Sequence, residues 1–251
     1  MQNLPLQGIR VIDYSHFLAG PYVGRCLAAM GAEVIKVERP GLGDAGRQHS
    51  HVLDDQQSGY FLQLNMGKQG VSVNMKDPRG KDFMQKLCDS ADVFIENYRP
   101  GALDKLGLGY QELSARNPKL VYCSISGFGQ EGPMADAPAY APVIHAASGY
   151  EQAYLEYQKA GDRPANNGIF IADVLGAVQA ASAIHLALFE RERSGKGQFI
   201  DVALLDSVLG MLVWEIQAAQ FPSRRKRQVY EPVRASDGYV MVAAVTPRIP
   251  P

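Results

Sequence analysis

Residues 9–39 decide the fold class, and they read IRVIDYSHFLAGPYVGRCLAAMGAEVIKVER. Two short runs rich in β-branched residues, IRVIDY at 9–14 and EVIKVER at 33–39, flank PYVGRCLAAMG at 21–31, whose apolar residues recur at helical spacing. Short strands that alternate with helical segments are typical of βαβ units and a parallel sheet. We therefore expect a strand, a helix and a second, parallel strand in this stretch.

Further along the chain, strand-like and helical segments continue to alternate. Asp77 and Pro78 mark the start of one helix, because an aspartate accepts hydrogen bonds from free N–H groups at a helix start and proline suits the first helical position. The segments are the runs FLQLN (61–65) and VSVNM (71–75), the helix at 77–91, DVFIENY (92–98), a short helical segment at 110–117 and LVYCSISGFG (120–129). This order predicts an α/β fold with one doubly wound, Rossmann-like parallel sheet and flanking helices.

From residue 140 onward the chain turns to long apolar helical stretches. They lie at 140–157, 170–192 and 206–221, and are separated by the polar loop GDRPANNG (161–168) and the strand QFIDVALL (198–205). These stretches are apolar enough to cover the sheet. Residues 1–221 are accordingly predicted to form one large Rossmann-like domain.

The segment after residue 221 has the composition of a linker followed by the start of a second, smaller domain. We place the linker at 222–235, and ASDGYVMVAAV then begins a new strand after an Asp-Gly turn. The chain ends before anything can pair with that strand, so residues 236–251 are expected to be the start of the smaller domain, with a truncation and a natural end both left open. The basic run Arg224–Arg227 is interpreted as a solvated linker face rather than a nucleic-acid patch.

The composition of the 251-residue chain is that of a soluble globular protein, with 46% apolar and 20% charged residues. Its 25 basic and 26 acidic side chains leave a formal net charge of -1, which supplies none of the positive field that nucleic-acid binding requires. Cys26, Cys88 and Cys123 are odd in number and far apart, so they predict neither a disulfide framework nor a metal site. A reducing, cytoplasmic location fits this cysteine usage best.

No membrane segment is expected. The N-terminus MQNLPLQGIRVIDY lacks the basic region and long apolar stretch of a secretory signal. The one stretch apolar enough to consider, Ile169–Phe189, carries Asp173, Gln179, Ser182 and His185. Because polar groups are costly in hydrocarbon, a buried protein helix is the preferred interpretation.

A glycine pattern between residues 41 and 46 resembles a dinucleotide-binding motif. Gly41, Gly43 and Gly46 spell G-x-G-x-x-G after a strand. The motif also requires a helix that opens on the loop and an acidic residue about 20 positions later. Neither is present, so no NAD site is predicted.

Histidines and aspartates in the next segment could be drawn as a metal site. His49 and His51 lie near Asp54 and Asp55. Without a third histidine at ligand spacing, we expect a solvated polar loop and no metal.

Two further polar residues stand out. His16 follows the first predicted strand, where open α/β sheets place ligands, although a histidine that merely shapes a turn fits equally well.

Asp173 is the only charged group between Arg163 and Glu190. As an N-cap it would stabilise its helix by about 1 kcal/mol. As a carboxylate in a mostly apolar pocket it would be poorly solvated and available as a nucleophile toward an activated acyl group. The residues alone favour the N-cap and leave the nucleophile open.

Several longer strings occur in a specific order along the chain. They are LQGIRVIDYSHFLAGP, GAEVIKVERPGLGD, LNMGKQGVSVNMK, ADVFIENYRPGALDKLGLGY, NPKLVYCSISGFGQEGP, the helix with Asp173, and SGKGQFIDVALLDSVLG. In order and spacing they resemble the family III CoA-transferases, the CaiB/BaiF type, over residues 6 to about 245. The resemblance implies an enzyme that transfers coenzyme A from an acyl-CoA to a small carboxylic acid.

The same resemblance implies a mechanism. Asp173 attacks the thioester carbonyl of an acyl-CoA and forms a mixed anhydride, and an aspartyl-CoA thioester then passes CoA to the acceptor acid. A carboxylate is a weak nucleophile, so the site must remove its water and place it close to the carbonyl carbon.

Coenzyme A-binding positions are also implied by the resemblance. Arg39, Lys68 and Lys105 are expected to pair with phosphates, and Tyr98 to offer an aromatic face. The full set is His16, Phe17, Arg39, Lys68, Asn97, Tyr98, Ala102 and Lys105.

The chain departs from the family pattern at Leu18, where some members place a glutamine that touches the acyl intermediate. In the family two longer chains interlock and a C-terminal part completes the large domain, so a homodimer is implied for a full-length chain.

The nearest alternative function is that of an α-methylacyl-CoA racemase of the same fold, which would use a histidine near position 140 as a base. Tyr140 stands there, and the next histidine is His145. A non-catalytic CoA-binding fragment is the alternative from another class.

Overall fold

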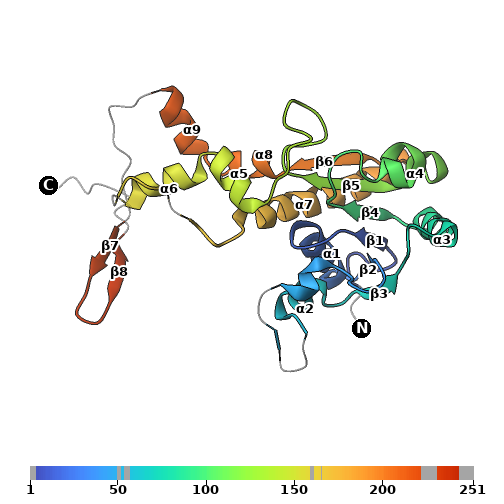
Figure 1. Cartoon of the computed structure of the whole chain (residues 1–251). Helices are drawn as coiled ribbons and strands as arrows, with labels where there is room; N and C mark the ends of the chain where they lie inside the picture. The colour runs from blue at the N-terminus through green and yellow to red at the C-terminus, as the bar shows by residue number, and fades with distance from the viewer. Residues whose placement is uncertain are drawn as a thin grey trace.

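The main sheet of the protein contains six parallel strands in the order β3-β2-β1-β4-β5-β6 (Figure 1). The structure is a computed structural model, and it describes residues 4–49, 52–53, 57–158, 161–164, 166–221 and 231–242. The strands are β1 (Arg10–Tyr14), β2 (Glu33–Glu38), β3 (Gln69–Ser72), β4 (Val93–Glu96), β5 (Val121–Ser126) and β6 (Phe199–Ala203). Every pair of neighbours in this sheet runs parallel, which confirms the predicted doubly wound α/β fold.

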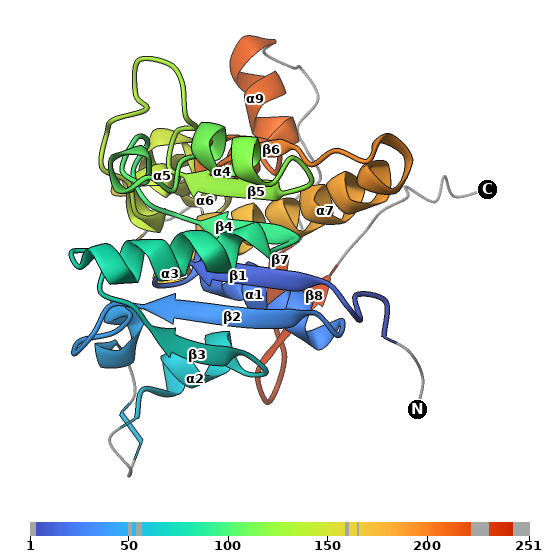
Figure 2. The same ribbon diagram turned by 90° about the vertical axis from the view of Figure 1, so that its right-hand side faces the viewer.

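Helices cover both faces of this sheet (Figure 2). One face carries α1 (Ala19–Ala29), α5 (Ala141–Ala147), α7 (Ile171–Ser194) and α8 (Leu204–Leu209), and the other carries α3 (Pro78–Asp89) and α4 (Tyr110–Arg116). The remaining helices are α2 (Gly59–Asn65), α6 (Tyr150–Gln158), α9 (Val213–Gln220) and the 3-10 helices η1 (Ala45–Gln48) and η2 (Asp104–Leu106). The helices thus enclose the strands between two layers.

Strand β1 explains why both faces need cover. Val11 packs into the apolar cluster under α1 and α7, and Ile12 packs into the cluster under α3 and α4, with both side chains 0% exposed. Successive side chains of a strand point to opposite faces, so an apolar run without polar alternation forms a strand that is buried on both sides. Burying each such side chain contributes about 1.5–3 kcal/mol relative to exposure.

Helix α3 begins where its sequence predicts. The Asp77 carboxylate accepts a hydrogen bond from the Arg79 N–H at 2.9 Å, and Pro78 is the first helical residue. This contact satisfies one of the N–H groups that a helix start leaves without a partner in the helix itself.

Helix α7 is the one helix in the described part of the chain that is long and apolar enough to cross a membrane, judged by length and composition, and 44% of its most apolar window is buried in the protein. It packs against α1, α8 and β5. Near its C-terminal end, Arg191 Nη1 lies 2.9 Å from the Asp92 carboxylate, and Gly195 ends the helix with a φ of 70°. These contacts agree with the prediction of a helix packed within the fold.

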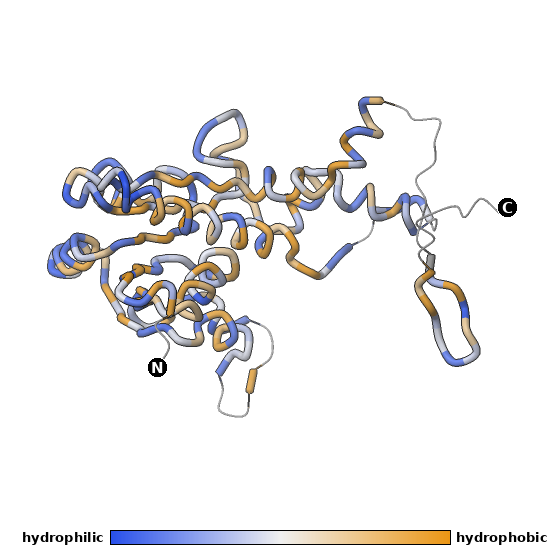
Figure 3. The backbone as a smooth tube through the Cα atoms, turned by 180° about the vertical axis from the view of Figure 1, so that it is seen from behind, coloured by the Kyte–Doolittle hydropathy of each residue, from blue (hydrophilic) through white to orange (hydrophobic). Residues whose placement is uncertain are grey.

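Strands β7 (Glu231–Arg234) and β8 (Tyr239–Val242) form an antiparallel hairpin that lies apart from the main sheet (Figure 1, Figure 3). Val233 pairs with Val240, and the Ala235 N–H donates to the Gly238 carbonyl at 2.9 Å across the turn. The expectation that nothing can pair with the strand after the Asp-Gly turn is therefore wrong, because a short turn lets the preceding residues supply the partner strand. The division into a large domain, a linker and a smaller domain remains a prediction. The run Arg224–Arg227 lies outside the described residues.

Candidate functional site

The direction of strand addition in the main sheet reverses between β1 and β4, and the candidate site lies at the carboxyl ends of these two strands. His16 follows β1, and Asn97 and Tyr98 follow β4. The Asn97 side chain accepts a hydrogen bond from the His16 N–H at 2.8 Å and donates one to the His16 carbonyl at 2.8 Å. Such a switch point is where open α/β sheets bind ligands, because the loops diverge and leave a crevice.

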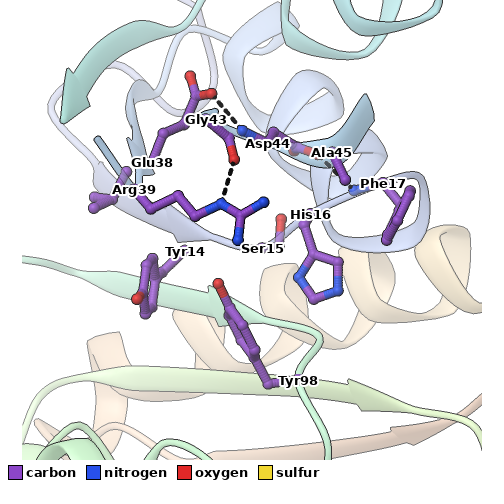
Figure 4. A pocket seen from close by; sticks show the side chains of 11 residues that line it. Tyr14, Ser15, His16, Phe17, Glu38, Arg39, Gly43, Asp44, Ala45 and Tyr98 are labelled. Atoms are coloured by element: carbon purple, nitrogen blue, oxygen red, sulfur yellow. Dashed lines mark hydrogen bonds between the residues drawn. The ribbon is translucent and has the colours of Figure 1, made fainter. Parts of the chain in front are cut away.

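One cavity at this edge, of about 410 Å³, lies between the loops that follow β1 and β2 (Figure 4). Aromatic rings, one cation and two carboxylates surround it. Its lining residues are Tyr14, Ser15, His16, Phe17, Val37, Glu38, Arg39, Gly43, Asp44, Ala45 and Tyr98. We call it the Arg39 cavity.

A second cavity of about 410 Å³ adjoins the first and contains Asp173. Small and apolar residues make up much of its wall. The lining residues are His16, Phe17, Ala19, Asn97, Tyr98, Arg99, Pro100, Ala102, Ile125, Ser126, Gly127, Ala135, Ala137, Pro138, Ala139, Tyr140, Asp173 and Leu204. We call it the Asp173 cavity. His16, Phe17 and Tyr98 line both cavities and form their common wall.

Phe17 adopts an unusual backbone conformation at this common wall. Its φ is 61°, the only positive φ of a non-glycine residue among the described residues. The Phe17 N–H donates to the Asp44 carboxylate at 3.1 Å, and its ring lies 5.2 Å from the His16 ring and 6.2 Å from the Tyr140 ring, centroid to centroid. A bulky residue with positive φ costs energy that the surrounding contacts must offset, and such residues concentrate at functional sites.

Asp173 is the third residue of α7 and not its N-cap. The N-cap position is Phe170, whose side chain makes no capping hydrogen bond. The N-cap interpretation of Asp173 is therefore wrong, because the helix begins two residues before it, at Ile171. The Asp173 carboxylate instead interacts with the backbone N–H groups of Asp173 itself and of Ala19, the first residue of α1, and both interactions lower its pKa.

The charge of Asp173 is poorly solvated. Burial raises the pKa of its carboxyl group to about 6, and the hydrogen bonds from the two N–H groups only partly oppose this rise. The carboxylate is therefore the major form above neutral pH, with less hydration than an exposed aspartate has. Desolvated charge next to a cavity is the property required of a carboxylate nucleophile.

His16 lies within the common wall as a neutral ring. Burial lowers the pKa of its imidazole, and Asp44 only partly opposes the shift. Its ring lies 4.7 Å from the Tyr98 ring in an edge-on arrangement. At neutral pH the imidazole is therefore available as a hydrogen-bonding and packing group rather than as a cation.

A network of four buried charges lies next to the Arg39 cavity, whose wall includes Asp44 from this network. Lys36 Nζ lies 2.9 Å from the Asp44 carboxylate and 3.8 Å from the Asp13 carboxylate, and it donates to the Ser15 carbonyl. Lys68 Nζ lies 2.7 Å from the other Asp13 oxygen. Burial alone would raise the pKa of Asp13, but Lys36 and Lys68 outweigh it and lower that pKa to about 2. The two cations and two anions are thus mutually compensated in a region from which water is excluded.

Lys68 belongs to this network and does not line either cavity. Its ammonium group donates to Asp13, to the Pro21 carbonyl and to Asn65, so all three of its N–H donors are used, and its side chain is 1% exposed. In this arrangement Lys68 has no free N–H donor for a phosphate, and a contact would need burial of the phosphate or exposure of the lysine. The pairing of Lys68 with a phosphate therefore stays a prediction.

The other predicted site residues divide into two groups. The cavities bring together His16, Phe17, Arg39, Asn97, Tyr98, Ala102, Tyr140 and Asp173. Lys105 lies exposed on η2, and Leu18 precedes α1; neither lines either of the two cavities. Arg39 is exposed, and its Nε donates to the Gly43 carbonyl at 3.2 Å (Figure 4).

The glycine pattern at residues 41–46 forms a loop followed by the 3-10 helix η1 rather than by an α-helix. The Asp44 carboxylate accepts the Gly46 N–H at 2.8 Å, which occupies a backbone donor that a pyrophosphate would need. Four residues were considered as a metal site in the sequence. The His49 ring stacks on the Tyr60 ring with 5.2 Å between centroids, and His51, Asp54 and Asp55 lie outside the described residues.

Sequence reasoning missed the buried charge network, although a signal for it exists. Asp13 and Lys36 are charged residues set among the apolar residues of two strands, and the register pairs them directly. A matched pair of opposite charges in two buried strands predicts an internal ion pair. The small residues at 135–139, which line the Asp173 cavity, carry no comparable pattern.

Comparisons with known proteins agree with this arrangement. A family model described as CoA-transferase family III matches residues 6–250. The chain is 38% identical over 249 residues to the succinyl-CoA:glutarate CoA-transferase of Mus musculus, covering 96% of this chain and 56% of that protein. It is 41% identical over 210 residues to the acetyl-CoA:oxalate CoA-transferase of Acetobacter aceti, covering 83% of this chain and 53% of that protein. The chain thus spans little more than half the length of these relatives.

Solved structures give the same relationship. Rv3272 of M. tuberculosis aligns with a TM-score of 0.86 at 33% identity, over 97% of this chain and 66% of that one. A CAIB/BAIF family protein from Brucella suis aligns with a TM-score of 0.85 at 36% identity, over 96% of this chain and 66% of that one. With the family model matching nearly the whole sequence, the chain belongs to CoA-transferase family III.

Proposed function

We propose that this chain carries the CoA-binding and nucleophilic part of an acyl-CoA:carboxylate CoA-transferase in which Asp173 is the nucleophile. The observation that carries this proposal is the position of a desolvated carboxylate in a cavity that shares a wall with a second, cation-bearing cavity. The names of the relatives pair an acyl-CoA with a carboxylate, and we transfer that substrate class, a cytoplasmic location and a homodimeric full-length enzyme to this protein as part of the proposal.

In this proposal the two cavities hold the two ends of an acyl-CoA. The Arg39 cavity takes the charged nucleotide end, because the exposed Arg39 guanidinium can pair with a phosphate and aromatic rings line the remainder. The Asp173 cavity takes the thioester, because its small and apolar lining leaves room for an acyl group and excludes water. The common wall of His16, Phe17 and Tyr98 lies against the pantetheine between them.

The reaction proceeds through three covalent intermediates at Asp173, namely a first anhydride, a thioester and a second anhydride. A carboxylate oxygen attacks the thioester carbonyl carbon, the C–S bond breaks, and CoA thiolate leaves from a mixed anhydride. The thiolate attacks the aspartyl carbonyl, so the donor acid leaves as its carboxylate and an aspartyl-CoA thioester remains. The acceptor carboxylate attacks this thioester, and the released thiolate takes the acceptor acyl group from the second anhydride. Asp173 returns to a free carboxylate, so no net proton or electron is consumed.

Burial assists the first step. A carboxylate in water is a poor nucleophile because its hydration shell must be removed, and at Asp173 folding has already removed part of it. The Ala19 N–H at the start of α1 lowers the pKa of this carboxylate and so favours its charged, nucleophilic form. A group held within reach of the carbonyl carbon reacts with a high effective concentration.

A racemase of the same fold remains the alternative function. That reaction needs a second base beside the aspartate to remove the α-proton. His145 does not line the Asp173 cavity, whereas His16 does, with a lowered pKa. Incubation of a 2-methylacyl-CoA in D₂O separates the two: racemisation incorporates deuterium at the α-carbon, and CoA transfer leaves that position unlabelled.

The proposal is tested by trapping the acyl enzyme on this chain. Incubation with succinyl-CoA followed by hydroxylamine is expected to convert Asp173 to a hydroxamate, which peptide mass spectrometry locates. Asp173→Asn should give none. Asp206→Asn is the matched control, because Asp206 is also the third residue of its helix, α8, and lines neither of the two cavities. A hydroxamate at another residue, or none in the wild-type chain over a panel of acyl-CoA thioesters, contradicts the proposal.

A further inference from the structure

A buried histidine contacts the helix turn that carries Asp173. His145 lies on α5 with a side chain that is 0% exposed. Its Nε2 accepts a hydrogen bond from the Ala172 N–H at 3.2 Å. Ala172 is the second residue of α7 and the immediate neighbour of Asp173 in the chain.

The other ring nitrogen of His145 faces a carboxylate on a different helix. His145 Nδ1 lies 3.5 Å from Glu151 Oε1 on α6, and the Glu151 side chain is 12% exposed. The same Glu151 oxygen accepts the Asn167 N–H at 3.3 Å, and Asn167 Nδ2 donates to the Tyr150 hydroxyl at 2.9 Å. Contacts from His145 and Glu151 therefore join α5, α6, the segment before α7 and the first turn of α7.

The start of α7 needs an acceptor from elsewhere in the fold. The first N–H groups of a helix have no partner within the helix, and Phe170 at the N-cap position has no side-chain acceptor to offer. The Ala172 N–H is buried, so without His145 it would lack a hydrogen-bond partner away from water. The imidazole thus takes the place of a conventional cap one residue before the carboxylate.

This contact requires one particular form of the imidazole. Nε2 can accept only if it carries no proton, so the proton of the neutral ring must lie on Nδ1, the nitrogen that faces Glu151. The Glu151 carboxylate selects that tautomer electrostatically. Burial lowers the pKa of His145, and Glu151 opposes the shift, so the neutral ring is favoured at neutral pH.

We propose that His145 is a positioning residue for the transfer reaction: through the Ala172 N–H, its neutral imidazole holds the first turn of α7 so that the Asp173 carboxylate stays directed into the Asp173 cavity. The inference rests on the proposed role of Asp173 as the nucleophile. It goes beyond that role because His145 lines neither of the two cavities.

Two substitutions of similar size separate positioning from simple core packing. His145→Gln places a side-chain oxygen near the position of Nε2 and keeps an acceptor for Ala172. His145→Asn is shorter, reaches only the position of Nδ1, and leaves Ala172 without its partner. The rate at which succinyl-CoA acylates Asp173 is expected to fall between about tenfold and a hundredfold in His145→Asn and to stay within about threefold of wild type in His145→Gln. CoA affinity, measured by calorimetry, should be unchanged in both.

Two measurements on the same chain do not depend on turnover. Nitrogen-15 spectra of the wild-type imidazole should give Nε2 the shift of an unprotonated nitrogen and Nδ1 that of a protonated one. Amide hydrogen exchange in peptides that cover residues 170–175 should accelerate in His145→Asn and not in His145→Gln. The ring spectrum needs no variant, so it decides the hydrogen bond even if His145→Asn fails to fold.

The outcomes separate this inference from the proposed function. If wild type gives no adduct on Asp173, the proposed function fails, while the ring spectrum and amide exchange still report whether His145 holds α7. If adducts form equally fast in wild type and His145→Asn, the positioning role is wrong. It is also wrong if Nε2 is protonated, or if both variants lose acylation and CoA affinity together, as general loss of packing would cause.

Discussion

Asp173 combines negative charge with burial, two properties that oppose each other in a protein interior. The pKa of its carboxyl group is about 6 in the folded chain against an ordinary value of 3.8. A carboxyl group whose pKa is higher in the folded state binds its proton more tightly there than in the unfolded chain. Its ionisation therefore lowers the free energy of unfolding as pH rises from about 4 to about 6, and the loss persists at higher pH.

Asp173→Asn is accordingly expected to stabilise the chain while it removes the adduct. At pH 7.5 the free energy of unfolding should rise by about 3 kcal/mol, because the neutral amide avoids the cost of the buried charge. At pH 4, where the wild-type carboxyl group is protonated in the folded state, the gain should vanish. Urea denaturation at both pH values measures it, and a gain that is equal at both would show that packing rather than charge is responsible.

Arg39 is the cation that the Arg39 cavity offers to a ligand. Arg39→Ala should weaken CoA binding between about tenfold and a hundredfold, since a well-formed charge-assisted contact contributes about 1.5–3 kcal/mol. Binding of a pantetheine thioester, which lacks the adenosine phosphates, should change far less. Calorimetry with both ligands makes the comparison. Arg79→Ala serves as the surface control, because Arg79 lies on α3, pairs with the N-cap residue Asp77 and lines neither of the two cavities. If Arg39→Ala lowers the affinity for both ligands equally, Arg39 does not bind a phosphate of CoA.

At the level of single residues, sequence predicts which side chains gather at the switch point better than it predicts what each one does. His16 and Tyr98 meet there because they follow β1 and β4, which are neighbours in the sheet, and the first turn of α7 brings Asp173 to the same cavity. Lys68 was expected to pair with a phosphate, and nothing in the sequence indicated its contact with Asp13, because a lysine in a motif looks the same whether its partner is a ligand or an aspartate from another strand. His145 gave no sign of its contact with Ala172, which depends on the angle at which α5 meets α7.

Among elements, the ion network connects β1, β2 and the segment between α2 and β3. Lys36 on β2 contacts Asp13 on β1 and Asp44 in the loop that follows β2, and Asp44 in turn accepts the Phe17 N–H. Removal of one member leaves the opposite charge buried without a partner, which is more costly than the loss of an exposed pair. The network thus fixes the two loops that border the Arg39 cavity.

Lys36→Met is expected to lower the free energy of unfolding by about 3–5 kcal/mol, because Asp13 and Asp44 would share the single remaining cation Lys68. The control is Lys86→Met, whose exposed pair with Asp82 on α3 should contribute about 0.3–0.5 kcal/mol. Urea denaturation followed by circular dichroism measures both. A loss below about 1 kcal/mol for Lys36→Met would mean that the two carboxylates become protonated or hydrated without disruption of the loops.

Elements were predicted most accurately where local chemistry marks their ends. The Asp77 and Pro78 pair locates the start of α3. The start of α7 carries no such local mark, because the acceptor for its Ala172 N–H is His145, a residue distant in sequence. Strand β7 was missed because EPVR carries no alternating pattern of its own and forms a strand only by pairing with β8.

For the whole molecule, the class of sheet was predictable from the sequence and the enclosure of the site was not. The alternation of strands and helices predicts a doubly wound sheet, and such a sheet has a switch point at which a ligand binds. The cavities themselves depend on loops of irregular conformation, such as the segment at 135–139 and the positive φ of Phe17, whose shape is set by tertiary contacts.

The common wall of His16, Phe17 and Tyr98 has a consequence for how a long ligand binds. Two cavities that meet at one wall can each hold a fragment without displacing the other, and a bond between the fragments makes the second contact intramolecular. Adenosine 3′,5′-bisphosphate and pantetheine should therefore bind together, each weakly, and CoA should bind more tightly than the better fragment by about 10²- to 10⁴-fold. Calorimetric titration of one fragment in the presence of the other tests this, and mutual displacement would mean that both fragments compete for one cavity. The two adjoining cavities therefore select ligands by length. A ligand too short to reach past Phe17 contacts only one cavity and gains no affinity from the other.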